Sequence, residues 1–245
     1  MNLILIVSLV ALLIGLSKGG MGASLGILAT PLLSQVMPVA DAIGLALPLL
    51  LIADAFALWM YWKTWDWRYI RLMLPAAILG IVVGTALLVS LPDDVMRRVL
   101  GIFTLIFVVY KLVGNNYLAT HYHPRPWHGV LAGGISGLGS ALANSGGPPY
   151  TAYMLLQNLQ PTVFVGTTTM FFALVNALKV PGLIAADRFH LDQLLSVAWV
   201  LPVLPFGVWL GRWLVKRVNA LAFERIMLAT LFITSMALLF IPPTR

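Results

Sequence analysis

The stretch Ser17–Gly22, SKGGMG, interrupts what would otherwise be one long apolar segment. Residues 3–16 before it are almost wholly apolar, and residues 23–33 after it, ASLGILATPLL, are mostly apolar again. Glycine is a poor helix former, and a full charge is costly inside a bilayer. The stretch therefore predicts two short helices joined by a break, in place of one spanning helix.

The composition of the chain indicates a membrane protein. Of its 245 residues, 60% are hydrophobic and 9% are charged, whereas soluble domains carry roughly 25% charged residues. Several apolar blocks approach the length of about 20 residues that a spanning helix needs, and they lack the alternation of a membrane β-barrel. We predict an all-α polytopic membrane protein with a single transmembrane domain over residues 1–245.

Four of the apolar segments form two pairs, and a glycine-rich break separates the two members of each pair. The first pair is split by SKGGMG, and the second by NSGGPP at residues 144–149. No segment in either pair is long enough to span a bilayer alone. The apolar segments lie at about 2–17, 24–36, 39–62, 71–91, 95–113, 128–143, 149–158, 162–182, 193–215 and 220–241.

The two halves of the chain share a common residue spacing. Gly19 and Gly20 recur 127 residues later as Gly146 and Gly147. The same spacing relates Pro75, Gly80, Gly84 and Arg98 to Pro202, Gly207, Gly211 and Arg225. We therefore predict a duplication, with repeat one at about 1–117, a loop at about 114–127 and repeat two at about 128–245.

The positions of the basic loops predict that the two repeats are inverted. The basic loop of the first half follows segment 39–62, whereas that of the second half lies one crossing later, after segment 193–215. Basic loops lie on the cytoplasmic side. Inversion requires an odd number of crossings in each half. We therefore predict two inverted four-element repeats, each with a broken or re-entrant helical hairpin plus three transmembrane helices. The basic residues are Lys63, Arg68 and Arg71 in the first loop and Arg212, Lys216 and Arg217 in the second.

The two breaks have the composition of an anion site. We expect short helices to begin after them, near Ala23 and Tyr150. The first N–H groups of a helix lack helical partners, and that end carries partial positive charge, so it attracts anions. Hydroxyl, amide and ammonium groups add donors. The predicted substrate-binding residues are Ser17, Lys18, Gly19, Gly20, Gly22 and Ser24 in the first break, and Asn144, Ser145, Gly146, Gly147 and Thr151 in the second.

Structural explanations compete with this prediction. Glycines in membrane helices often serve only close helix packing, which is how we interpret Gly80-x-x-x-Gly84 and Gly207-x-x-x-Gly211. Packing alone is also an alternative for the two breaks. Lys18, for its part, would extend toward a membrane interface if its hairpin were shallow.

Asp54 is the second costly residue, because it lies inside segment 39–62. Asn176 and Lys179 lie in the corresponding segment of the second half. We interpret these three residues as coupling or cavity-lining groups, with a structural pair between Asp54 and a lysine as the alternative. We predict no metal site, because the clustered histidines of HYHPRPWH (residues 121–128) lie in a proline-containing loop.

The chain resembles the sulfite exporter TauE/SafE family over essentially its full length. The resemblance rests on GLSKGGMGASLGILATPLL (15–33), DWR (66–68), PAAILGIVVGTALL (75–88), GGISGLGSALANSGGPPYTAYML (133–155) and NALK (176–179). It implies secondary transport of small sulfur-containing anions across the bacterial cytoplasmic (inner) membrane. The family often has further glycines where this chain has Ser17 and Lys18, and a fixed positive charge there suits an anion.

Together these observations predict a secondary transporter that moves sulfite, thiosulfate or an organosulfonate by alternating access. A non-transporting membrane scaffold or assembly protein is the alternative. An enzyme is not expected, because no histidine accompanies a serine at membrane depth. Nucleic acid is excluded as a partner, because no basic run exceeds two residues. No cofactor is expected, and proton coupling and a homodimer are left open.

Overall fold

The computed structural model describes residues 3–21, 25–114, 125–188, 191–214 and 220–240. Within these ranges every regular element is a helix. Three helices, α3, α4 and α8, are long and apolar enough to cross a membrane. The elements are α1 Leu3–Leu16, η1 Ser17–Met21, η2 Gly26–Leu28, α2 Ala29–Leu33, α3 Val39–Met60, α4 Trp67–Ser90, α5 Asp93–Gly114, α6 Pro126–Ala143, α7 Gly147–Leu155, α8 Pro161–Ala185, α9 Leu191–Ser196, η3 Ala198–Val200, α10 Val203–Leu214 and α11 Ala220–Phe240.

Most segments predicted from the sequence correspond closely to these helices, but two differ. Segment 24–36 comprises the 3-10 turn η2 and the short helix α2. Segment 193–215 is not one helix but comprises the end of α9, the 3-10 turn η3 and α10. Pro202 has no N–H to donate to the carbonyl of Ala198. That carbonyl instead accepts from the N–H of Leu201 at 3.1 Å, which gives a 3-10 turn. The equivalent Pro75 lies inside the continuous helix α4.

Two of the hydrophobic clusters in the interior exchange one element between the halves of the chain. The first is built from α1, α2 and α3 together with η3 and α10, and the second from α6, α7 and α8 together with α4. Each cluster thus combines the first three helices of one half with the fourth helix of the other.

Glycines allow the exchanged helices to pack closely. A Cβ atom at Gly80 would overlap the backbone of Gly134 on α6, and one at Gly84 would lie 2.7 Å from the Cβ atom of Ala141. Likewise, a Cβ atom at Gly207 would lie 3.0 Å from the Cα atom of Gly15 on α1. The predicted packing role of these glycines is confirmed, since no side chain fits at such backbone distances.

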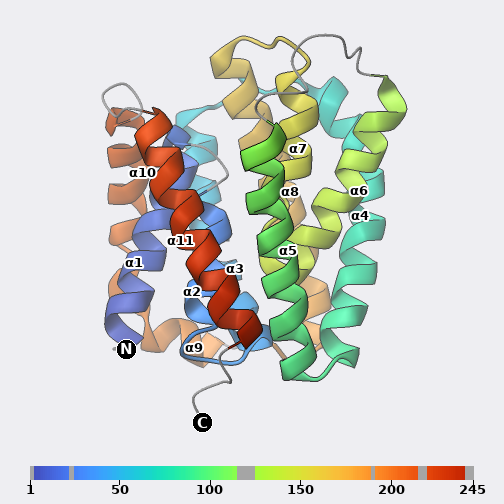
Figure 1. The fold of residues 1–245 in the computed structure, drawn as a ribbon. Coiled ribbons are helices and arrows are strands. Elements are labelled where there is room, and N and C mark those ends of the chain that lie inside the picture. Colours follow the sequence, from blue (N-terminus) through green and yellow to red (C-terminus); the bar gives the residue numbers. More distant parts are fainter. Residues whose placement is uncertain (1–2, 22–24, 115–124, 189–190, 215–219, 241–245) are drawn as a thin grey trace.

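Helix α3 runs antiparallel to α8, and α5 runs antiparallel to α11. The start of α3 lies beside the end of α8, where Arg188 donates to Asp41 at 3.1 Å. At the other end, the N–H of Asp66, just beyond α3, donates to Thr167 near the start of α8 at 2.9 Å. Similarly, Gly101 near the start of α5 packs against Leu239 at the end of α11. Figure 1 shows α5 and α11 side by side, with α1 beginning and α11 ending at the same end of the bundle.

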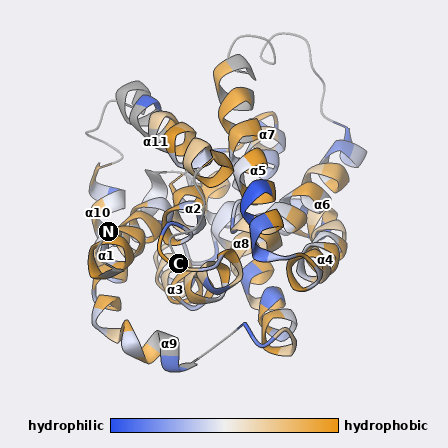
Figure 2. Ribbon diagram, turned by 60° about the horizontal axis from the view of Figure 1, so that its bottom comes forward, coloured by the Kyte–Doolittle hydropathy of each residue, from blue (hydrophilic) through white to orange (hydrophobic). Residues whose placement is uncertain are grey.

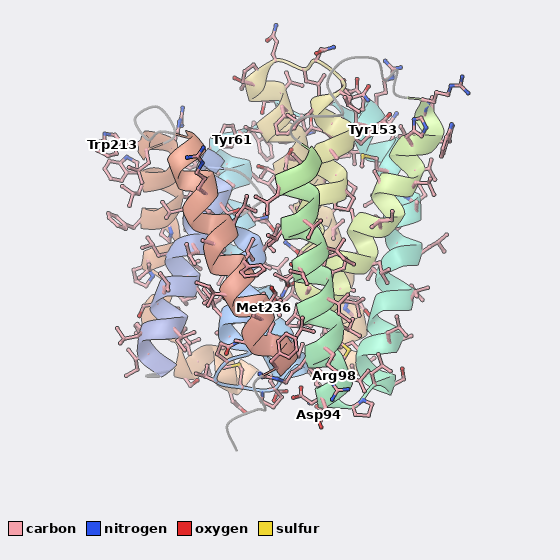
Figure 3. All side chains as sticks on the ribbon, in the orientation of Figure 1. Tyr61, Asp94, Arg98, Tyr153, Trp213 and Met236 are labelled. Carbon is pink, nitrogen blue, oxygen red and sulfur yellow. The ribbon has the colours of Figure 1, made fainter. Side chains whose placement is uncertain are left out.

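Hydrophobic residues cover much of the outer surface of the bundle. Figure 2 shows apolar colouring on the outward faces of most helices. Large apolar side chains are exposed there, for example Leu79 and Val82 on α4 and Trp209 on α10. This surface suits lipid rather than water. Charged residues such as Asp94 and Arg98 lie at the lower end of the bundle (Figure 3).

The packing of α4 against α6 predicts opposite effects for two neighbouring glycines. A Cβ atom at Gly137 would overlap the carbonyl of Ala77, whereas one at Gly134 would lie 3.7 Å from the carbonyl of Ala76. We expect Gly137→Ala to lower the thermal stability of the detergent-solubilised protein markedly. Gly134→Ala should be neutral or stabilising by up to about 1 kcal/mol, because alanine favours the helix. Equal destabilisation by both changes would contradict this packing.

Candidate functional site

Lys18 and Asp54 form a buried ion pair in the centre of the sequence-predicted site. Lys18 lies in the π-helical turn η1 at the end of α1, and its ammonium pairs with the Oδ1 atom of Asp54 on α3. Their side chains are only 13% and 3% exposed. The ammonium is thus directed into the bundle, and the alternative that it extends to a membrane interface is wrong.

Asn176 on α8 completes the surroundings of this carboxylate. Its amide Nδ2 atom donates to the Oδ2 atom of Asp54 at 2.7 Å. Phe172, one turn earlier on α8, has its ring centroid 5.8 Å from the ammonium nitrogen of Lys18. Asp54 therefore pairs with a lysine, as the structural alternative expected. A role of Asp54 in coupling is compatible with this pair.

The second lysine, Lys179, lies at the second break. Its ammonium donates to the Oδ1 atom of Asn144 at 2.6 Å and to the carbonyl of Ser140 at 3.1 Å. Because an ammonium can only donate, the amide oxygen of Asn144 must face Lys179. The amide nitrogen of Asn144 then donates to the hydroxyl of Thr30 on α2 at 3.1 Å.

The local fold explains why Asn144 occupies this place. It ends α6 with φ 50° and ψ 27°, in the left-handed region that asparagine adopts more readily than most residues. Its own N–H donates to the carbonyl of Ser140 at 3.0 Å. The end of α6 is therefore closed by the Asn144 backbone and the Lys179 ammonium together, and a cation is favourable at a helix C-terminus.

These contacts form two groups, one around Asp54 and one around Asn144, which α8 joins. We call the two groups together the polar network, which lies between the two hydrophobic clusters. Lys18, Asp54 and Thr30 belong to the side of α1, α2 and α3. Asn144, Asn176 and Lys179 belong to the side of α6 and α8. Phe172, Asn176 and Lys179 follow one another at helical spacing, so one stripe of α8 contacts both breaks. The structure thus brings together five of the sequence-predicted residues, Lys18, Asp54, Asn144, Asn176 and Lys179.

The other predicted residues of the first break have structural contacts. The carbonyl of Gly19 accepts from the hydroxyl of Tyr61 at 3.3 Å, and a Cβ atom at Gly19 would overlap Val208 on α10. Gly20 has φ 115°, which only glycine adopts readily. Ser17 is buried. Gly22 and Ser24 lie outside the described residues, as does the predicted helix start near Ala23, and the first described helical turn after them begins at Gly26.

The second break presents fewer backbone donors than its glycines suggest. Helix α7 begins at Gly147, three residues before the predicted start near Tyr150, and Pro148 and Pro149 follow. Neither proline has an N–H to offer an anion. The carbonyl of Gly146 accepts from the hydroxyl of Ser136, and the hydroxyl of Ser145 donates to the carbonyl of Ala143 at 3.0 Å. Thr151 lies half-buried on α7.

Charge is unevenly distributed in the network. Lys18 has a carboxylate partner, whereas neither of the acceptors that the described residues give Lys179 is a carboxylate. Lys179 is nevertheless only 1% exposed. The partial negative charge at the end of α6 offsets part of its charge. With all three groups ionised, the network carries one net positive charge, and that surplus lies at Lys179 rather than Lys18.

Sequence reasoning missed Thr30, Phe172 and Ser140 as members of this network. Thr30 was visible as a polar residue in a short apolar segment, but its partner Asn144 is 114 residues away. Ser140 contributes only its carbonyl oxygen, which no side-chain pattern indicates.

The helical bundle and its buried ionic network define a multi-pass membrane protein. The chain belongs to the sulfite exporter TauE/SafE family, whose profile matches residues 7–238, nearly the whole chain. This is a family of transporters rather than enzymes, and it implies a membrane transporter of sulfur-containing anions. Comparison with curated proteins and with solved structures found no match.

The ion pair predicts a non-additive effect on stability. Lys18→Met leaves the Asp54 carboxylate buried without its cation, and breaking a buried pair costs about 3–5 kcal/mol. Adding Asp54→Asn removes that charge, so the double variant should be more stable than Lys18→Met alone. Thermal unfolding of the four proteins in detergent measures this coupling. Additive losses would show that the pair contributes nothing as a unit.

Proposed function

We propose that the protein is a secondary transporter that moves sulfite, thiosulfate or an organosulfonate across the bacterial cytoplasmic membrane by alternating access. The observation that carries this proposal is the positive surplus at Lys179, buried between two hydrophobic clusters and beside a broken helix. A buried charge needs compensation. A small anion bound in the network supplies it, whereas a transported cation would add to the surplus.

The substrate site in this proposal is formed by the two breaks. Its residues are Ser17, Lys18, Gly19, Gly20, Gly22, Ser24, Asn144, Ser145, Gly146, Gly147 and Thr151, with Asp54, Asn176 and Lys179 as coupling or cavity-lining groups. Because Asp54 already neutralises Lys18, we assign the main attraction for the anion to Lys179. The ammonium of Lys18 contributes fully only when the Asp54 carboxylate is protonated. Anion binding and proton uptake are linked in this way.

Many transporters that work by alternating access are built from two structurally related halves, and we propose that the repeats here are inverted, with the boundaries predicted from the sequence. Two observations support this. Helices α3 and α8 run antiparallel, as do α5 and α11, and each pair joins equivalent helices. Moreover, each of the two hydrophobic clusters combines three helices of one half of the chain with the following segment of the other half. Transporters with broken helices near the membrane centre commonly have this plan.

The scaffold alternative does not explain the network. A protein that only binds another membrane protein needs no buried ions, because apolar residues of similar volume are usually as stable as a buried ion pair or more so. A transporter needs polar groups at this depth.

The transport proposal predicts separate roles for binding and coupling. In proteoliposomes, the wild-type protein should move labelled sulfite, thiosulfate or a small sulfonate, and an imposed pH gradient should drive accumulation. Asp54→Asn keeps the hydrogen bonding capacity toward Asn176 but cannot be ionised. It should still bind the anion and exchange it down its gradient, yet lose accumulation driven by the pH gradient. Absence of any anion movement by the folded wild-type protein would contradict the proposed function.

Inversion predicts the sidedness of three exposed positions. The chain contains no cysteine, so single cysteines can replace Arg68, Arg212 and Asp94 directly. An impermeant maleimide should label the first two only from the cytoplasmic side and the third only from the outside, because basic loops lie in the cytoplasm. Figure 3 shows Tyr61 and Trp213 at the end of the bundle opposite Asp94. Labelling of Arg68→Cys and Arg212→Cys from opposite sides would refute this arrangement.

A further inference from the structure

The ammonium of Lys179 occupies a place where other transporters hold a free ion. In transporters with broken helices, unwound carbonyls and the C-terminal ends of half-helices coordinate the coupling cation. Here the Ser140 carbonyl belongs to the last turn of α6, and the Asn144 side chain follows directly at its end. Both oxygens accept from the ammonium of Lys179, at 3.1 and 2.6 Å.

We propose that Lys179 is a tethered cation that fills the coupling-ion position at the end of α6, so that the protein works without a bound Na⁺ there. This inference rests on the proposed function only where it assigns the position to a coupling ion. Whether Lys179 fills that position can be tested without measuring transport. The lysine comes from α8, and its side chain is fully enclosed, with 1% exposure.

The hydrogen-bond inventory supports this assignment. An ammonium has three donors, and the described residues accept two of them, at Ser140 and Asn144. The same cation orients the Asn144 amide, which in turn donates to Thr30 on α2 at 3.1 Å. A single positive charge thus holds the end of α6 and links it to both α8 and α2, and the described residues leave one of its donors for an anion.

The position of Asp54 shows why Lys179 serves this role and Lys18 does not. The Oδ1 atom of Asp54 pairs with Lys18 on η1, and its Oδ2 atom accepts from Asn176 on α8. Lys18 is therefore compensated by a carboxylate. Lys179 is compensated only in part, by neutral oxygens and the end of a helix, which are the ligands of a bound cation rather than of an ordinary ion pair.

The test compares two truncations of Lys179 in detergent by thermal unfolding. Lys179→Ala removes three methylenes and the ammonium, which n-propylammonium chloride can replace as a free cation. Lys179→Met fills most of the same volume without a charge and leaves no room for the probe. We expect n-propylammonium to raise the Tm of Lys179→Ala by several degrees in a saturable way, as binding to the folded state does. Neither Lys179→Met nor the wild type should respond, nor should choline, which cannot donate from nitrogen, affect any of the three.

Two results would overturn the proposal. One is equal stability of Lys179→Met and the wild type, because a filled cation position must contribute to holding the break. The other is a wild-type protein whose Tm or transport requires Na⁺ when choline replaces it at constant ionic strength. If Lys179→Ala fails to fold even with the probe, the wild-type Na⁺ comparison decides the question. Rescue of Lys179→Ala in a protein that moves no sulfur anion would refute the transport function but keep the tethered cation.

Discussion

The structure depends on one constraint, that the polar backbone groups freed by a helix break must find partners inside the protein because lipid offers none. The first break is satisfied partly by Tyr61, whose hydroxyl donates to the Gly19 carbonyl. The second is satisfied by Ser136 at the Gly146 carbonyl and by Lys179 at the end of α6. These contacts explain why so many polar residues lie at this depth in a chain with few charges.

One ammonium group lies at each break, but the two lysines come from different kinds of element. Lys18 lies in the first break itself and is paired with Asp54. The position equivalent to Lys18 in the second half is Ser145, and there the ammonium comes instead from α8. Both breaks therefore have a cation, although different elements supply it. Only the second cation lacks a carboxylate among the described residues, so the two breaks differ in their attraction for an anion.

The sequence predicted much of this arrangement because local patterns carry it. Glycine pairs located both breaks, and the cost of burying Asp54 indicated a lysine partner. The choice of partner was not predictable, because it depends on how helices pack. Lys179 was expected to line a cavity, yet it contacts Asn144, 35 residues away. The break before α10 was also missed. A proline alone does not predict such a break, since Pro75 at the equivalent position lies inside the continuous helix α4.

The two hydrophobic clusters suggest where the proposed motion takes place. Glycines leave almost no space between α4 and α6 or between α1 and α10, so each of these pairs moves as one unit. Because each pair joins different halves of the chain, neither half is a rigid body by itself. Between the clusters, Asn176 reaches Asp54 and Asn144 reaches Thr30 through hydrogen bonds, beside apolar contacts of α3 with α6 and α8. Hydrogen bonds can exchange protein partners for an anion or water at little net cost, whereas close-packed glycine interfaces cannot slide without clashes. The polar network lies where these helices meet, and in the proposed motion an anion bound there would contact both clusters.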